Sequence, residues 1–345
     1  MDESSDQEPI SRCDYCRLPL GDSSVTLERE GVTYRFCSRS CRDAMTDHDH
    51  VFAVYHGFKR FKPGISALDA HLPQGLPRNS FVLLSGVEGT RDGAVHAELV
   101  WRTLERGEPA VIMSFQEPPI SQVESFLTLD WNVLPYLERG QLQIIDCFTY
   151  RVADRRRMFD RLNSWNRYLH RVSDAATTTI RDPSDMAELQ SKLDTVLEGL
   201  EMVDSGILLI DSLTELGTRA QPIQAYDFVK DVRADVCKGR YVTVFAGATY
   251  TGGDETFPHD LGYAVDGIVE LEHNATTVED ALIKRIRIRK MNGVLTIPEW
   301  TAYEYTAGRG LVSFDPEKEV QQAFERRLAA ESESEPPTES DGGSS

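Results

Sequence analysis

Residues Phe81 to Trp101 read FVLLSGVEGTRDGAVHAELVW. An apolar run, Phe81 to Leu84, gives way to a glycine-bearing loop and then to apolar residues at helical spacing. A strand, a glycine-bearing loop and a helix in this order are typical of a P-loop nucleotide site, whose motif is G-x-x-x-x-G-K-[ST]. This order predicts an α/β fold with a mostly parallel central sheet flanked by helices.

The loop departs from the motif in its second half. With Gly86 as the first glycine, Arg91 takes the place of the second glycine, Asp92 that of the lysine and Gly93 that of the Ser/Thr. The lysine normally neutralises the β and γ phosphates and the hydroxyl holds Mg²⁺, so a carboxylate in the lysine position repels the triphosphate. We therefore interpret this stretch as a nucleotide-hydrolase scaffold with a degenerate P-loop, and expect weak or absent ATP and Mg²⁺ binding.

Length and charge limit the classes of protein that fit. The 345 residues, 40% of them hydrophobic, are enough for one large domain or two smaller ones. The N-terminus is acidic, without a signal peptide pattern, and no apolar run reaches the roughly 18 residues that span a membrane, so we expect a cytoplasmic protein.

The net charge is -19. Residues 1–10 carry four acids, residues 331–345 carry five, and neither segment has a base, which leaves -10 for the body. This negative charge on residues 11–330 argues against nucleic-acid binding, which relies on Lys and Arg.

Lys is scarce among the basic residues: only 8 of the 37 are Lys. Abundant acid with Arg in place of Lys resembles proteins of halophilic archaea, in which surface charge maintains solubility; a GC-rich genome with acidic tails is the alternative.

Four cysteines indicate a separate N-terminal unit. Cys13, Cys16, Cys37 and Cys41 follow the pattern C-x2-C, twenty residues, C-x3-C. In a reducing compartment two close cysteine pairs favour a tetrahedral Zn²⁺ site, because a unit this short gains the free energy it needs from metal binding. Reduced buried thiols or an adventitious disulfide are the alternatives. The alternating residues between the pairs predict a hairpin that turns near Glu30 and Gly31. The unit resembles the TRASH zinc-finger family, which implies a role in metal sensing or trafficking.

Another predicted strand, later in the sequence, ends in an aspartate. The run GILLIDSL, Gly206 to Leu213, is an aliphatic strand ending in Asp211 and Ser212. In P-loop enzymes a strand-end Asp holds the water shell of Mg²⁺. A buried parallel strand that ends in a capping Asp is the plainer reading.

The segment before the loop contains the run PGISALDAHLPQGLPRNS, with Gly64, Leu68, Asp69, Gly75, Leu76, Pro77 and Ser80. At these residues the segment resembles RecA-fold ATPases of the KaiC type. The resemblance spans about Pro63 to Phe314. It implies a RecA-like P-loop fold, a second strand at Glu108 to Phe115, and catalytic glutamates at positions 116 and 117, of which only Glu117 is present.

The same resemblance extends to a late strand, IKRIRIRKMNG. In the family a Lys-Met-Arg-Gly strand end contacts the γ-phosphate of a neighbouring subunit. Lys290, Met291 and Gly293 match, whereas Asn292 replaces the arginine, and loss of such an arginine costs orders of magnitude in rate.

Two functions therefore compete. The first is a regulatory or signal-transduction protein that acts through a protein partner or as a homo-oligomer, such as a RecA-like ring, with weak or no ATP hydrolysis. The second is an active ATPase with a rearranged loop, in which Asp211 acts on Mg²⁺ and Glu117 positions water. Its nucleotide contacts are Gly86, Gly89, Thr90, Arg91, Ser212 and Lys290, with Arg91 replacing the lysine one residue early.

The predicted organisation has two folded units. Residues 1–10 form an acidic tail, 11–47 the zinc unit, 48–62 a linker, 63–314 the RecA-like domain with a helical insertion at about 150–204, and 315–345 a helix followed by an acidic tail.

Overall fold

The computed structural model describes residues 11–21, 24–29, 31–47, 59–152, 157, 161–250, 257–275, 282–316 and 318. Contacts between residues divide the chain into two compact units, Met1–Phe61 and Lys62–Ser345. Most of the predicted linker, and nearly all of the predicted C-terminal helix, lie outside the described residues.

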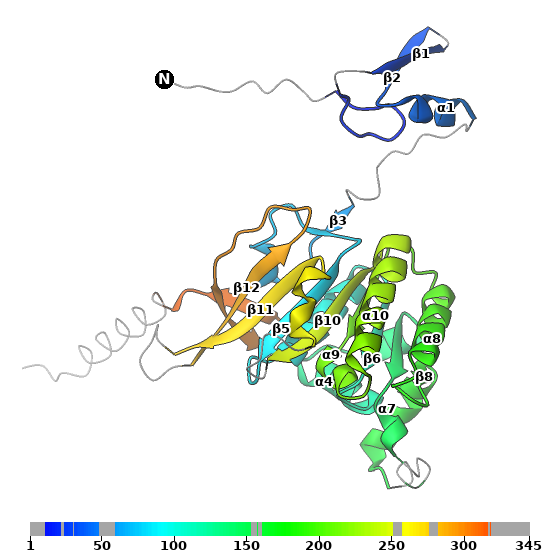
Figure 1. The fold of residues 1–345 in the computed structure, drawn as a ribbon. Helices are drawn as coiled ribbons and strands as arrows, with labels where there is room; N and C mark the ends of the chain where they lie inside the picture. Colours follow the sequence, from blue (N-terminus) through cyan, green and yellow to red (C-terminus); the bar gives the residue numbers. More distant parts are fainter. Residues whose placement is uncertain are drawn as a thin grey trace, which may run out of the picture. The chain divides into compact units, whose positions relative to one another are not determined.

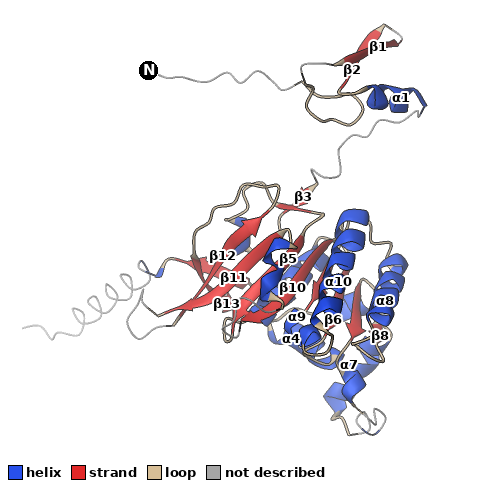
Figure 2. Cartoon of the chain, viewed as in Figure 1, coloured by secondary structure: helices blue, strands red, loops and turns tan. Residues whose placement is uncertain are grey.

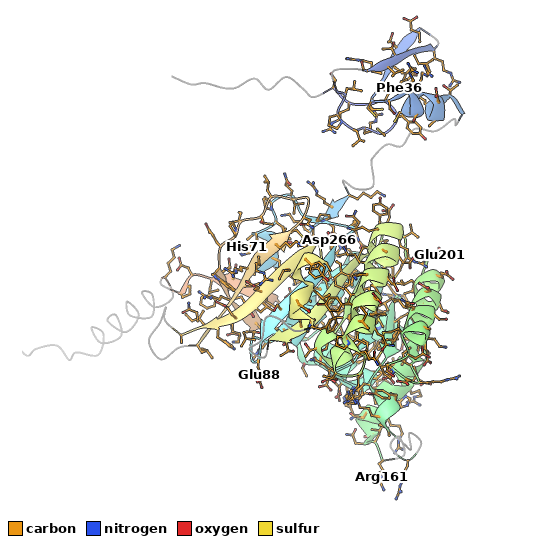
Figure 3. The ribbon with its side chains drawn as sticks, viewed as in Figure 1. Phe36, His71, Glu88, Arg161, Glu201 and Asp266 are labelled. Carbon is orange, nitrogen blue, oxygen red and sulfur yellow. The ribbon has the colours of Figure 1, made fainter. Side chains whose placement is uncertain are left out.

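The N-terminal unit is a hairpin and a helix. Strands β1 (Val25–Arg29) and β2 (Val32–Phe36) pair antiparallel, and α1 (Arg39–Asp47) follows. The turn passes through Gly31 at a φ of 78°, as the sequence predicts. Phe36 is fully buried and packs with Cys13, Tyr15 and Met45 (Figure 3).

The larger unit is built on a 10-stranded sheet in the order β14-β13-β12-β11-β5-β10-β9-β6-β7-β8 (Figure 1). Neighbouring strands pair parallel along β11, β5, β10, β9, β6, β7 and β8. They pair antiparallel along β11, β12, β13 and β14. The strands of this sheet are β5 (Phe81–Val87), β6 (Ala110–Ser114), β7 (Leu142–Asp146), β8 (Thr177–Thr179), β9 (Ile207–Ile210), β10 (Thr243–Tyr250), β11 (Gly267–Asn274), β12 (Ile283–Met291), β13 (Thr301–Thr306) and β14 (Gly310–Phe314); β3 (Arg60–Phe61) and β4 (Leu76–Pro77) precede it.

Helices alternate with the parallel strands, as the predicted α/β fold requires (Figure 2). They are α2 (Ser66–Asp69), α3 (Asp92–Glu105), α4 (Pro119–Thr128), α5 (Leu134–Glu138), α7 (Ser164–Asp174), α8 (Met186–Gly199), α9 (Leu213–Gly217) and α10 (Pro222–Val232). The 3₁₀-helices η2 (Thr149–Arg151) and η4 (His259–Tyr263) are short, and the π-helix η3 (Arg233–Gly239) directly follows α10. Among the described residues, no helix is long and apolar enough to cross a membrane.

Strand β5 is buried on both faces. Phe81 and Leu83 pack in one core cluster with residues of α8 and α10. Val82 and Leu84 alternate with them and are equally buried, so their side chains point to the opposite face of the sheet. This two-sided burial explains the unbroken apolar run, which is typical of a central parallel strand.

The predicted helical insertion differs from the structure in one respect. Between α7 and α8 the chain forms β8, which pairs parallel with β7 through Ile144 and Thr177. Its sequence, three threonines, is polar enough to be mistaken for a loop, but threonine is β-branched and fits a strand at the edge of a sheet.

Candidate nucleotide-type site and metal centre

The loop between β5 and α3 contains two residues in the left-handed conformation. Gly89 has a φ of 87° and Arg91 has φ 60° and ψ 42°, directly before α3. This left-handed conformation is natural for glycine and costs other residues about 1–2 kcal/mol. Arg91 thus stands where the motif has its second glycine and adopts a conformation that suits glycine.

Residues from distant strands hold this loop. The Tyr303 hydroxyl of β13 donates to the Thr90 carbonyl at 2.6 Å, and the Thr90 hydroxyl donates to the Val87 carbonyl at 2.7 Å. The His273 Nε2 atom of β11 lies 3.1 Å from the carbonyl oxygen of Glu88, which Figure 3 labels. Side chains of β11 and β13 therefore help to hold the backbone of the loop in this shape.

The Asp92 side chain lies within the curve of the loop. A Cβ atom built on Gly86 would be 3.2 Å from the Asp92 Cβ and 3.7 Å from its Cγ. Asp92 is the first residue of α3, so its charge is favoured by the helix dipole. It forms no hydrogen bond or ion pair with the residues that the structure describes. An unpaired carboxylate thus occupies the lysine position of the motif.

Asp211 joins the ends of β6 and β9. It accepts hydrogen bonds from the backbone N–H groups of Phe115 (2.7 Å) and Gln116 (3.2 Å), the Ser114 hydroxyl (3.2 Å) and the Gln122 amide (3.0 Å). Burial raises the pKa of the Asp211 carboxyl to about 7, although these donors oppose the rise. The Asp211 carboxyl therefore holds its proton to a higher pH than an ordinary Asp does.

A cavity of about 370 Å³ lies where these elements meet. Residues from the loop, α3, α4 and the ends of β6 and β9 line it, and those with ionisable side chains are Arg91, Asp92, His96, Glu117 and Asp211. Arg91, Glu117 and Asp211, which the active-ATPase hypothesis groups in one site, thus line the same cavity.

Other predicted contacts have local structural roles. Ser212 caps the N-terminus of α9, where its hydroxyl accepts from the Glu215 N–H at 3.0 Å. Thr90 is fully buried. Neither residue lines the cavity, and neither do Gly86 or Gly89, which shape the loop.

Lys290 lies toward the other end of the sheet. Its ammonium donates to the carbonyls of Gly262 (2.9 Å) and Val265 (2.7 Å). Ile268 pairs with both Lys290 and Leu83, three residues before Gly86. At about 3.3 Å per residue, Lys290 is about 10 Å along the strands from the start of the loop.

Two histidines at this site escaped the sequence prediction. His96 lines the cavity and is 5% exposed, and His273 contacts the loop from β11. The position of His96, four residues after Asp92, was a usable signal, because such residues share a helix face. No sequence signal pointed to His273, because its position beside the loop depends on how the strands pair.

The four predicted zinc cysteines form one cluster in the N-terminal unit. Their sulfur atoms all lie within 4.8 Å of one another, with Sγ distances of 3.6 Å from Cys16 to Cys37 and 3.7 Å from Cys37 to Cys41. A tetrahedral site with Zn–S bonds of about 2.3 Å separates its sulfurs by about 3.8 Å. The cluster therefore fits Zn²⁺.

The thiols of this cluster differ in acidity. Burial raises the pKa of Cys13, but backbone N–H groups outweigh it and lower the value to about 7. Burial and the neighbouring thiols raise the pKa of Cys16 to about 12. A bound cation would favour the thiolate form of all four.

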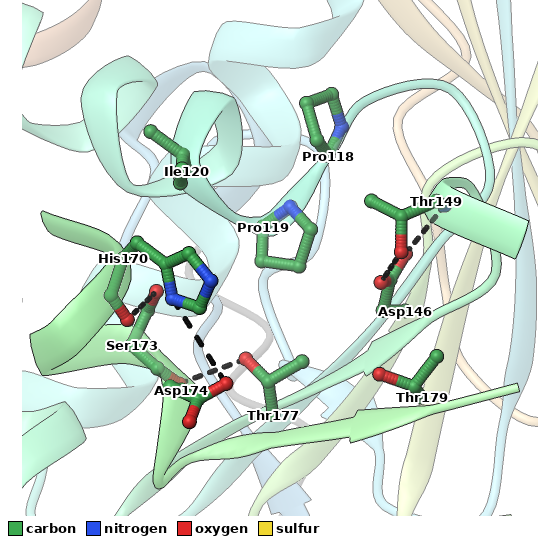
Figure 4. Close-up of a pocket in the computed structure, with 10 residues that line it drawn as sticks. All are labelled: Pro118, Pro119, Ile120, Asp146, Thr149, His170, Ser173, Asp174, Thr177 and Thr179. Carbon is green, nitrogen blue, oxygen red and sulfur yellow. Dashed lines mark hydrogen bonds and ion pairs between the residues drawn. The ribbon is translucent and has the colours of Figure 1, made fainter. Parts of the chain in front are cut away.

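A second cavity, of about 90 Å³, lies beside β7 and β8 (Figure 4). The His170 Nδ1 atom lies 3.9 Å from the Asp174 carboxyl group in its wall, and the Ser173 hydroxyl donates to the His170 carbonyl. Asp146 accepts from the N–H and the hydroxyl of Thr149. These polar groups are satisfied by the chain itself, which makes this cavity a weaker candidate.

The comparisons with known proteins agree with both units. Residues 9–44 match the MYM-type zinc finger with FCS sequence motif, and Phe36, Cys37 and Ser38 spell that motif. This match supports a zinc finger and does not single out the TRASH family.

The larger unit resembles archaeal and bacterial proteins. A UPF0273 protein of Methanopyrus kandleri is 26% identical over 267 residues, covering 75% of this chain and 93% of the relative. One from Thermotoga maritima is 24% identical over 263 residues, covering 75% and 97%. A solved KaiC-like protein of Pyrococcus horikoshii has a TM-score of 0.57 at 17% identity, covering 74% of this chain and 99% of its own. Residues 61–318 match the family described as "ATPase: KaiC". The chain therefore belongs to the KaiC ATPase family.

Proposed function

We propose that this chain is a non-hydrolysing member of its family, which acts as a regulatory or signal-transduction protein through a protein partner. The observation that carries the proposal is the Asp92 side chain, which packs against Gly86 where the motif has its lysine. Gly93 supplies no hydroxyl for Mg²⁺, Gln116 replaces one glutamate and Asn292 replaces the trans arginine. These four changes lie at three separate places in the fold, the start of α3, the end of β6 and the end of β12, and all act against catalysis.

Repulsion between the Asp92 carboxylate and a bound triphosphate is large compared with the usual free energy of nucleotide binding. A like-charge contact at about 4 Å costs about 4 kcal/mol at an effective dielectric constant near 20. A micromolar Kd corresponds to about 8 kcal/mol. We expect the loop to bind ATP weakly and to hydrolyse none that can be measured.

The N-terminal unit, with Zn²⁺ on its four cysteines, is the part of the chain best suited to partner recognition. A zinc-supported unit in the same chain as an ATPase fold that does not hydrolyse ATP would suit a regulator that recognises a partner. We further propose that the protein is adapted to high salt and works in the cytoplasm, in view of its charge excess and low Lys content.

An active ATPase is the second candidate, and the position of Arg91 favours it. This exposed residue lines the same cavity as Asp211 and Glu117, so its guanidinium is placed to contact a phosphate there.

ATP titration and phosphate release in high-salt buffer separate the two candidates. Under our proposal wild-type protein binds weakly, and the combined change Arg91→Gly, Asp92→Lys and Gly93→Thr restores binding more than turnover. Asp92→Asn alone recovers part of the binding, since it removes only the charge. Steady hydrolysis by the wild type that is lost in Asp211→Asn or Glu117→Gln would establish the active ATPase instead.

A further inference from the structure

Helix α7 carries aromatic and basic side chains on its outer face. Its buried residues, Leu169 and Ser173, face the rest of the unit, where the helix packs on α4 and α5. Trp165, Tyr168 and Arg171 follow one another at a spacing of three residues and therefore share another face of the helix. Trp165 is 49% exposed and Tyr168 is 38% exposed. Aromatic rings that stay in water on a packed helix are typical of an interaction surface.

These three side chains contact one another. The ring centroids of Trp165 and Tyr168 lie 5.8 Å apart, with the planes tilted by 33°. The Cζ atom of Arg171 lies 5.9 Å from the centroid of the Tyr168 ring. Arg161, which Figure 3 labels at the lower edge of the view, and Arg167 are exposed in the same segment. We call Trp165, Tyr168 and Arg171 the α7 face; Trp, Tyr and Arg are the residues enriched at the centres of protein interfaces.

The segment around the α7 face is basic in an acidic chain. Residues 150–174 contain seven Arg and three Asp, a charge of +4, whereas the whole chain has a charge of -19. The next helix, α8, carries three acids and one Lys. A nucleic-acid strand would meet repulsion outside this short segment, because each of its phosphates is charged. A short acidic peptide fits the limited extent of the positive charge.

Residues 331–345 have the matching composition. They contain five acids and no base, and Pro336 and Pro337 stand between Glu335 and Glu339. Proline rings pack on exposed aromatic rings, which is how Pro-rich segments are recognised. Carboxylates pair with the guanidinium of Arg. These residues lie outside the described part of the chain, and their match with the α7 face is one of charge and residue type.

The positions of the two segments favour contact between two copies of the chain. Strands β14 and β8 are the two edges of the 10-stranded sheet, and α7 directly precedes β8. At about 4.8 Å between neighbouring strands, these edges lie about 40 Å apart. The helix predicted for residues 315–330 spans about 24 Å at about 1.5 Å per residue. Residues 331–345 therefore fall short of the α7 face of their own chain, whereas a head-to-tail contact between two copies needs no such span.

We propose that the α7 face binds residues 331–345 of a second copy of this chain. The acidic side chains pair with Arg171 and the neighbouring arginines, and the prolines pack on Trp165 and Tyr168. The aromatic part of this contact is retained at high salt, because screening weakens only the charged part. The contact is independent of the proposed function, since no residue of the α7 face lines the cavity beside the loop.

A labelled peptide tests the contact on the full chain. The probe is a fluorescein-labelled peptide with the sequence of residues 331–345, and its fluorescence anisotropy is followed as the full chain is added. We expect saturable binding. Binding should weaken but persist when KCl is raised from 0.1 M to 1 M, because the Debye length falls from about 10 Å to about 3 Å. A peptide with Gln or Asn at its five acidic positions should not bind.

Four variants locate the contact. Trp165→Ala should weaken peptide binding by about 10-fold or more, as loss of an aromatic interface anchor does. Arg171→Ala should weaken it by about 2–5-fold, the effect of one exposed ion pair. The matched controls are Tyr263→Ala and Arg309→Ala, at an exposed aromatic and an exposed Arg outside α7; both should bind the peptide as the wild type does. Thermal melting checks that each variant is folded.

Self-association of the full chain identifies the occupant. Sedimentation of the wild type should show association that rises with protein concentration and falls when unlabelled peptide is added in excess. A full-chain variant with Gln or Asn at the five acidic positions of residues 331–345 should associate less than the wild type. Trp165→Ala should associate less as well.

Three results would overturn the inference. The first is no binding of the peptide, or equal binding by the wild type, Trp165→Ala and Arg171→Ala. The second is a single-stranded RNA of about 15 nucleotides that binds more tightly than the peptide and depends on the same two residues, which would assign the α7 face to nucleic acid. The third is equal association of the wild type and the variant without the five acids. None of these measurements reports on ATP, so the proposed function stands or fails separately.

Discussion

The Tyr303 hydroxyl donates a hydrogen bond of 2.6 Å to the backbone carbonyl of Thr90, a residue 213 positions earlier in the chain. Tyr303 is 1% exposed and belongs to β13, on the antiparallel side of the sheet. The late strands thus complete the loop by supplying a partner for one of its buried carbonyls.

Tyr303→Phe should lower the free energy of unfolding by about 1–3 kcal/mol, because it leaves the Thr90 carbonyl without its donor. Urea denaturation measures the loss. The matched control is Tyr305→Phe in the same strand. The Tyr305 hydroxyl is buried and has no partner among the described residues, so its removal should be neutral or stabilising. Equal losses in the two variants would show that the Thr90 contact is unimportant.

Arg91→Gly should stabilise the protein by about 0.5–1 kcal/mol. The change relieves the left-handed strain at Arg91, and the greater freedom of glycine in the unfolded chain cancels part of the gain. Gly89→Ala is the opposite test, because its φ is 87° and the new Cβ would lie 3.1 Å from the His273 Nε2 atom. It should destabilise by about 1 kcal/mol or more. Thermal melting of both variants checks the pair, and shifts of the same sign would contradict the argument.

The pKa of Asp211 predicts a pH dependence of stability. A folded-state pKa of about 7, against an ordinary 3.8, means that the folded protein binds more protons than the unfolded chain between these values. The stability from the protonated carboxyl is therefore full at low pH and is lost as the pH rises through about 7.

Asp211→Asn isolates this group because the amide cannot ionise. The free energy of unfolding of the variant minus that of the wild type should rise from about pH 4 to about pH 7 and then level off. Denaturation at a series of pH values measures this difference. A difference that stays constant with pH would show that Asp211 is ionised throughout.

Cys37→Ser should release the metal from the N-terminal unit and unfold that unit alone. A structural Zn²⁺ supplies folding free energy directly, and the cluster lies within a unit that has its own small core. Metal analysis should fall from about one equivalent to none, while amide exchange in the larger unit stays unchanged. Cys237→Ser, at a buried cysteine of the larger unit, is the control that keeps its zinc.

Dialysis into low-salt buffer should lower the melting temperature, because the charge of -19 then loses its screening. Thermal scans at several concentrations of KCl measure the effect. A transition that does not move would favour the GC-rich-genome explanation of the scarce Lys.

The sequence alone predicted the features that depend on local order. Three such features are the apolar run Phe81 to Leu84, the strand that ends in Asp211 and the spacing of the four cysteines. In each, residues close together in the sequence are enough to indicate the local structure. Burial on both faces requires an unbroken apolar strand, and a tetrahedral metal requires ligands at short spacing. The parallel sheet and the cysteine cluster were therefore predictable before any coordinates.

Tertiary structure decided the contacts between segments far apart in the chain. Strand β8 exists because Thr177 pairs with Ile144, and its residues alone do not demand it. The partner of Thr90 comes from β13, and the ring of His96 fits because β10 has a glycine at position 247. These contacts depend on the register of strand pairing and on a glycine in a distant strand. Neither leaves a periodic pattern in the sequence of the loop or of α3. The sequence thus determined where the loop and the strand that ends in Asp211 lie along the chain, and packing determined which distant side chains hold the loop.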